Sequence, residues 1–264
     1  MKHPSEETLW PASHFDLGEE PHFLFIITPP FSGSTALAKI LNTSHRTVLL
    51  ENRGEGQWLV PGLCQEDRWN PDKQVDYASV RAVWMNRFQM LKQFTPGADV
   101  VVEKSPPNMV RLEQLANIFP NHSFIANNRN PYASCSSRLY RNFKGAQLDP
   151  AQRLVELERL LADWLTRSAV IQDLVVRRGI PLLTYEEFCQ HPPRLLDILR
   201  LPVGVTDTMN PAASVQVKDY QPQPIVNQNE RQIARLTDAE IAYMARQLVP
   251  HQGLLAFFGY EMLV

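Results

Sequence analysis

Gly33, Ser34 and Thr35 form a candidate anion-binding turn. They follow the apolar run Phe23–Ile27 and open the helix-forming stretch 36–41. Backbone amides at a helix start lie at the positive end of its dipole, and glycine lets a ligand approach the backbone closely. The pattern therefore predicts a phosphate cradle, although a plain Ser/Thr cap of the helix is an open alternative. The turn lacks the second glycine and the lysine of a Walker A loop.

A second anion site is predicted around Arg129, which follows the apolar segment 124–126. Ser137 lies eight residues further on, about two turns into a helix expected from Pro131 to about Arg141. Helical spacing places four polar residues of this segment on one face: Ser134, Ser137, Arg138 and Arg141. Arg129 and Ser137 could hold a phosphate through charge-assisted hydrogen bonds. A solvated helix face is the alternative.

Lys104 is a third candidate, because it lies in the turn Glu103–Pro107, directly after the strand-like run Asp99–Val102. Taken alone, it reads as a surface lysine. The carboxyl ends of parallel strands lie at one edge of a sheet, however, so Lys104, Arg129 and the turn at Gly33 would converge there. Together they predict a site for one extended, multiply anionic ligand.

In this order, the three segments resemble the sulfotransferase family that uses 3'-phosphoadenosine-5'-phosphosulfate (PAPS). Phe31–Thr35 is similar to the turn that binds the 5'-phosphosulfate end of the donor. Arg129-Asn-Pro-Tyr-Ala-Ser-Cys-Ser-Ser137 resembles the element that binds the 3'-phosphate. Glu103-Lys-Ser-Pro106 is similar to a lysine-bearing turn of the bacterial and tyrosyl-protein branches. The resemblance implies in-line sulfuryl transfer to a hydroxyl or amine.

The resemblance extends to about residue 261. Leu183–Phe188 resembles the segment whose tyrosine, here Tyr185, lines the nucleotide site, and the tail containing Arg231 resembles the closing segment. The implied donor-binding residues are Ser32, Gly33, Ser34, Thr35, Ala36, Arg129, Ser137, Tyr185 and Arg231. The family usually has Arg or Lys before the serine of the first turn, whereas this chain has Phe31. Lys104 is the natural substitute donor to the sulfuryl group.

The family's carboxylate base, where one is used, follows the strand after the first helix. Glu51 is therefore the first candidate for the general base and Glu55 the second; loop acids exposed to solvent are the alternative reading. We expect His45 and His122 to be surface or cap residues rather than bases.

Strand-like runs that alternate with helical patterns predict an α/β fold: a single-domain, P-loop-like parallel β-sheet with helices on both faces. A further apolar segment at 180–183 follows a long amphipathic pattern over 154–174. One sulfotransferase-like domain is expected over 1–264, with a peripheral N-terminal segment over 1–20. The aromatic stretch Trp58–Phe94 departs from the alternation and is read first as core packing, with a wall of the acceptor pocket as the alternative.

Composition limits the function classes. The chain has 264 residues with 26 Lys and Arg against 28 Asp and Glu, a net charge of −2 that disfavours nucleic acid or a membrane surface as partner. The 3 cysteines and 7 histidines show no metal-ligand spacing, so no metal is expected. No apolar run is long enough to span a membrane, and we expect a cytoplasmic enzyme. The expected partners are the nucleotide donor and a hydroxyl-bearing acceptor, and the sequence leaves room for a homodimer.

The sequence leaves two other functions open. A P-loop-type small-molecule kinase is disfavoured by the missing Walker lysine. A non-catalytic nucleotide-binding homologue is the third reading, motivated by Phe31.

Overall fold

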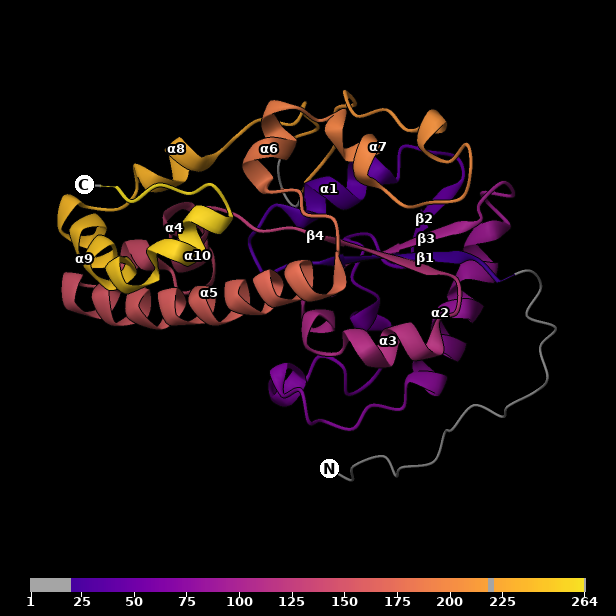
Figure 1. The fold of residues 1–264 in the computed structure, drawn as a ribbon, viewed down its shortest axis with the longest axis horizontal. Coiled ribbons are helices and arrows are strands. Elements are labelled where there is room, and N and C mark those ends of the chain that lie inside the picture. The colour runs from indigo at the N-terminus through magenta and orange to yellow at the C-terminus, as the bar shows by residue number, and fades with distance from the viewer. Residues whose placement is uncertain (1–19, 218–220, 264) are drawn as a thin grey trace.

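A parallel sheet of four strands forms the centre of the molecule, in the order β2-β3-β1-β4 (Figure 1). The computed structural model describes residues 20–217 and 221–263, so all but the last residue of the predicted segment 1–20 lies outside the described residues. The strands are β1 (His22–Ile27), β2 (Thr47–Leu49), β3 (Val100–Glu103) and β4 (His122–Ala126). Because every pairing is parallel, all carboxyl ends lie at the same edge.

The predicted strands are confirmed, and the segment at 180–183 joins the sheet weakly. Leu182 makes one parallel bridge to Ala126 at the β4 edge. Two backbone hydrogen bonds support it: the Ala126 amide donates to the Pro181 carbonyl (2.8 Å) and the Leu183 amide to the Ala126 carbonyl (2.9 Å). This bridge brings the residues after Leu183 next to those after β4.

Helices cover both faces of the sheet (Figure 1). The α-helices are α1 (Ser34–Leu41), α2 (Tyr77–Lys92), α3 (Leu112–Ile118), α4 (Pro131–Asn142), α5 (Pro150–Arg178), α6 (Tyr185–Gln190), α7 (Arg194–Ile198), α8 (Asn229–Ile233), α9 (Asp238–Leu248) and α10 (Gln252–Phe257). Short 3-10 helices lie at Gly56–Leu59, Glu66–Trp69, Pro106–Val110, Gly145–Gln147, Thr206–Thr208 and Val249–His251.

The apolar run of β1 is explained by these two layers. Phe23 and Phe25 point into a core built with α2, α3 and α5, whereas Leu24 and Ile26 point into a second core built with α1, α6 and α7. A strand buried on both faces needs apolar residues at every position. The predicted α/β architecture is therefore present.

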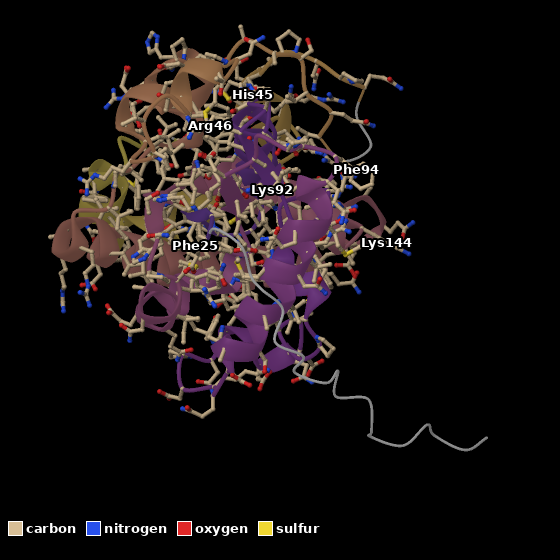
Figure 2. The ribbon with its side chains drawn as sticks, turned by 90° about the vertical axis from the view of Figure 1, so that its right-hand side faces the viewer. Phe25, His45, Arg46, Lys92, Phe94 and Lys144 are labelled. Atoms are coloured by element: carbon tan, nitrogen blue, oxygen red, sulfur yellow. The ribbon has the colours of Figure 1, made fainter. Side chains whose placement is uncertain are left out.

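The stretch 58–94 divides between core and surface. Trp84 and Phe88 of α2 are fully buried and pack in the core on the Phe23 side, which confirms the core-packing interpretation for them. Phe25 belongs to the same core, whereas Phe94, just beyond α2, projects at the surface (Figure 2). Within the described residues, no helix is both long and apolar enough to cross a membrane.

Candidate active site

A cleft of about 660 Å³ opens where the strands end. Its lining comes from the segments that follow all four strands, together with α4, α6 and the segment before α9. The predicted residues that the structure brings together there are Gly33, Ser34, Thr35, Ala36, Glu55, Lys104, Arg129, Ser137, Tyr185 and Arg231. Ser32 and Glu51 do not line it.

The turn into α1 is shaped by Gly33, which is the N-cap residue with a φ of 81°. The Ser/Thr cap considered from sequence is wrong: no side chain of the described residues caps α1. The first amides of a helix have no partner within the helix, so this start can receive an anion. A Cβ on Gly33 would lie 2.3 Å from Cδ2 of Tyr185, so glycine is required both by φ and by space. The buried Ser32 hydroxyl lies beneath the turn without a described partner.

Arg129 is a buried cation at the end of β4. Its Nε donates to Oδ1 of Asn229 (2.9 Å) and its Nη1 to the Phe31 carbonyl (3.3 Å), while Nη2 is buried without a partner in the described chain. The guanidinium lies over the Tyr185 ring, 4.2 Å from its centroid. Burial lowers the pKa of Arg129. A buried, oriented guanidinium with an unused donor is suited to an anionic group of a ligand.

The predicted polar face of α4 splits in two. Ser137 and Arg141 line the cleft with Arg129. Arg138 instead pairs with Asp163 of α5 (2.7 Å), and Ser134 lines a small hollow beside it. The single face expected for all four residues is wrong, because packing against α5 turns one side of α4 away from the cleft.

Lys104 and Glu55 form a buried ion pair, with 2.5 Å between Nζ and Oε1. The side chain of Lys104 is only 3% exposed. Oε2 of Glu55 accepts from Nε1 of Trp58 and Nε2 of Gln57, both at 2.9 Å. Burial raises the pKa of Glu55, but the charge and hydrogen bond of Lys104 and the other two donors outweigh it, so the pKa lies below its usual value. Glu55 is therefore a carboxylate beside a cation at neutral pH.

Glu103 joins the loop after β2 and the loop after β3, which carry Glu55 and Lys104. The sequence did not predict this role. Its carboxylate accepts from the amide of Gly56 (2.8 Å) and the amide of Ser105 (3.1 Å), as well as from the Ser105 hydroxyl and the Asn108 side-chain amide. The Lys104 amide also donates to the Gly54 carbonyl (2.8 Å). Complete burial raises the pKa of Glu103 to about 7. Glu103 thus fixes the position at which Lys104 and Glu55 meet.

The other candidate bases lie away from the cleft. The Glu51 carboxylate accepts from the backbone amide of Arg53 (2.7 Å) and stays in the turn after β2. His45 is exposed before the start of β2, at the opposite edge of the sheet, where it lies near Arg46 (Figure 2). His122 begins β4 and its Nδ1 contacts the Phe119 carbonyl (2.5 Å). Among the predicted bases, Glu55 alone reaches the cleft.

Tyr185 connects the first turn to the segment before α8. It follows Thr184, whose side chain caps α6. The Tyr185 hydroxyl donates to the Val226 carbonyl (3.1 Å) and accepts from the Gln228 amide (3.0 Å). These bonds hold residues 223–228 as a wall of the cleft, which only tertiary structure could show. Arg231 reaches the cleft from α8.

The charge of the cleft is unlike that of the whole chain. The lining includes seven basic residues: Arg53, Arg68, Lys104, Arg129, Arg141, Arg231 and Arg235. Among the described residues of the lining, Glu55 is the single acid. Low-dielectric walls concentrate such a field, so a polyanion is the expected ligand. Within the residues that the structure describes, His, Cys, Asp and Glu form no group that could hold a metal ion.

A parallel sheet with an uncapped helix start and a cationic cleft defines an α/β protein suited to an anionic ligand. A profile described as the sulfotransferase family matches residues 21–203. The chain therefore belongs to the sulfotransferase family and is a transferase.

Comparison with solved structures agrees with this fold. The sulfotransferase from Alicyclobacillus acidocaldarius has a TM-score of 0.52 at 14% identity, covering 92% of this chain and 97% of the other. The sulfotransferase domain of the Synechococcus PCC 7002 olefin synthase also has a TM-score of 0.52, at 18% identity, covering 93% and 97%. A search among curated protein sequences finds no match.

Proposed function

We propose that this transferase moves a sulfuryl group from PAPS to a hydroxyl of an acceptor, with Arg129 and the turn at Gly33 holding the two anionic ends of the donor. The observation that carries the proposal is that Nη2 of buried Arg129 has no partner among the described residues and lies in the same cleft as the start of α1, which no described side chain caps. Ser137 and Arg231 would join Arg129 at the 3'-phosphate, and Tyr185 would lie beside the donor.

The order of the strands supports this division of roles. Across the sheet edge, Glu55 follows β2, Lys104 follows β3, the Gly33 turn follows β1 and Arg129 follows β4. The Gly33 turn and Arg129 follow adjacent strands. Neighbouring strands lie about 4.8 Å apart, so the end of β3, which precedes Lys104, is roughly 10 Å from the end of β4. This order suits a donor whose 3'-phosphate lies at Arg129, whose 5'-phosphate lies at the Gly33 turn and whose sulfuryl group lies toward Lys104.

Lys104 and Glu55 are the proposed catalytic pair. When bound, PAPS would supply an activated sulfuryl group with a phosphate leaving group. The Lys104 ammonium would stabilise charge that develops on the transferring group, because it is buried and already oriented. The Glu55 carboxylate would take the proton of the acceptor hydroxyl. Glu55 replaces Glu51 as the proposed base, because its carboxylate meets Lys104 in the cleft.

Phe31 takes part through its backbone. It has a φ of 67°, and its carbonyl accepts from Arg129. The family usually has Arg or Lys at this position. Phenylalanine carries no positive charge, so Lys104 would act in its place. The homodimer, the single domain over 1–264 and the cytoplasmic location remain predictions.

Titration of the pure protein with 3',5'-adenosine bisphosphate and, separately, with ATP and magnesium tests the donor. We expect binding of the bisphosphate with strong preference; preference for ATP would favour the kinase reading. Turnover of labelled PAPS with a panel of alcohols then separates an enzyme from a non-catalytic homologue. A chelator should leave this turnover unchanged.

A further inference from the structure

Beyond the ion pair, the cleft continues into a part that the proposed donor residues do not use. We call it the outer pocket; its residues are Trp58, Cys64, Arg68, Trp69, Pro106 and Pro107. Contacts join its segments: the Cys64 thiol donates to the Gln57 carbonyl (3.2 Å), and Nη1 of Arg68 donates to the Cys64 carbonyl (3.1 Å). The outer pocket adjoins Glu55 through Trp58, as expected for the place where an acceptor binds.

Trp58 is a fixed aromatic surface at the entrance. Its side chain is large and 62% of the residue is exposed, yet its Nε1 is held by Glu55 at 2.9 Å. An indole tethered by its edge keeps a broad apolar surface open next to the candidate base. Such a surface binds a flat ring by stacking, which would bring a hydroxyl of that ring toward the Glu55 carboxylate.

Arg68 adds positive charge that no acid balances. Its Nη1 bonds only to the carbonyls of Cys64 and Gln65, and in the described parts of the chain it forms no ion pair with a carboxylate. The neighbouring acid in sequence, Asp67, pairs with Lys73 instead. Arg68 therefore has charge available for a ligand in the outer pocket.

A second arginine increases this imbalance. Arg167 stacks on Trp69, 4.1 Å from the ring centroid, and shares one carboxylate, Asp163, with Arg138. The pKa of Arg167 is lowered to about 10, mainly by burial; Asp163 opposes this effect, and the nearby charges of Arg138, Arg68 and Arg159 add to it. Arg167 does not line the outer pocket, but it lies against Trp69, which does, and so it adds positive charge behind that residue.

From this juxtaposition we propose that the acceptor is an anionic ring alcohol, whose ring stacks on Trp58 and whose carboxylate or sulfate group is held by Arg68. The proposal rests on the proposed function, because that function assigns the outer pocket to the acceptor. A neutral acceptor would leave the Arg68 guanidinium without an anionic partner. The ring can be a saccharide or an aryl group, since both offer a flat face and a hydroxyl.

Calorimetry on the full chain saturated with 3',5'-adenosine bisphosphate tests the proposal with two matched pairs of acceptors. One pair is 4-nitrophenyl β-glucuronide and 4-nitrophenyl β-glucoside; the other is 4-hydroxyphenylacetate and its amide. We expect the anionic member to bind about tenfold more tightly in at least one pair at low salt. The preference should shrink in about 0.5 M salt, where exposed charges are screened. The pair that responds identifies saccharide or aryl.

Three variants test which residues cause the preference for the anionic acceptor. Arg68→Gln should reduce the preference to less than about twofold while leaving binding of the neutral member unchanged. Trp58→Leu should weaken both members of a pair equally. The matched control is Arg177→Gln, which removes an exposed guanidinium of α5 outside the cleft and should change nothing.

Equal or tighter binding of the neutral member in both pairs, no binding of any of the four compounds, or a preference that survives Arg68→Gln would overturn the proposal. The bisphosphate titration separates the two levels of inference. Protein that binds the bisphosphate but shows no charge preference refutes the anionic acceptor alone, whereas failure to bind the bisphosphate refutes the proposed function and the acceptor with it.

Discussion

Replacing Arg129 by methionine should remove most of the affinity for a 3'-phosphate. Methionine fills similar volume without charge, and the native guanidinium is buried with no carboxylate partner in the described chain, so we expect the variant to fold. The loss should appear in binding, because Nη2 has no other described partner.

The magnitude follows from the environment of Arg129. Truncating one member of a buried, hydrogen-bonded charge pair costs about 2–5 kcal/mol in binding. The guanidinium is already desolvated and oriented by Asn229 and Tyr185, so little of the gain on binding is offset by ordering. We take about 3 kcal/mol, which is roughly 150-fold in Kd.

Isothermal titration with 3',5'-adenosine bisphosphate and with 5'-AMP isolates this effect. The variant should lose roughly 150-fold for the bisphosphate. It should change by less than about threefold for 5'-AMP, which lacks the 3'-phosphate. Arg177→Gln is the control for general charge. Equal losses for the two nucleotides would show that Arg129 supports the cleft as a whole and would refute the assigned contact.

Four further predictions concern the same cleft. Lys104→Ala should lower turnover of labelled PAPS by about 10²–10³-fold while hardly changing the Kd of the bisphosphate; parallel losses would count against its catalytic role. Glu55→Gln should lower turnover by about 10²–10⁴-fold, and turnover at the native rate would contradict its role as base. Gly33→Ala should abolish bisphosphate binding in a protein that still melts cooperatively, because its Cβ would meet Tyr185; normal binding would refute the cradle. Glu103 keeps its proton in the folded chain between about pH 4.5 and 7 while the unfolded chain releases it, so stability should fall by roughly 3 kcal/mol over that range in urea titrations. Glu103→Gln should remove that slope, and an unchanged slope would contradict the burial argument.

Much of the fold followed from local sequence. The buried strand β1 is recognisable because both faces need apolar side chains, and α4 because Pro131 is a favoured first helical residue. Parallel strand ends meet at one edge, so the convergence of Lys104 and Arg129 could be predicted without coordinates.

Side-chain direction could not be predicted. Sequence placed Glu51 ahead of Glu55 as the base, but the loop closed by Glu103 turns only Glu55 toward Lys104. Ser134 and Ser137 differ in the same way, because α5 packs on one side of α4. Such differences depend on contacts between residues far apart in the chain.

Arg68 of the outer pocket and the wall at 223–228 were missed for a related reason. Arg68 lies in the short 3-10 helix Glu66–Trp69, which is too short to show a helical period in the sequence. The wall is held by the hydroxyl of Tyr185, a contact across more than 40 residues. The spacing of apolar and polar residues gives no information about contacts between segments so far apart in the chain.

The most direct measurement is a crystal structure of the protein with 3',5'-adenosine bisphosphate. We predict the 3'-phosphate on the guanidinium of Arg129 and the hydroxyl of Ser137, and the 5'-phosphate on the amides that begin α1. A nucleotide bound with its phosphates away from both Arg129 and Gly33 would contradict the account.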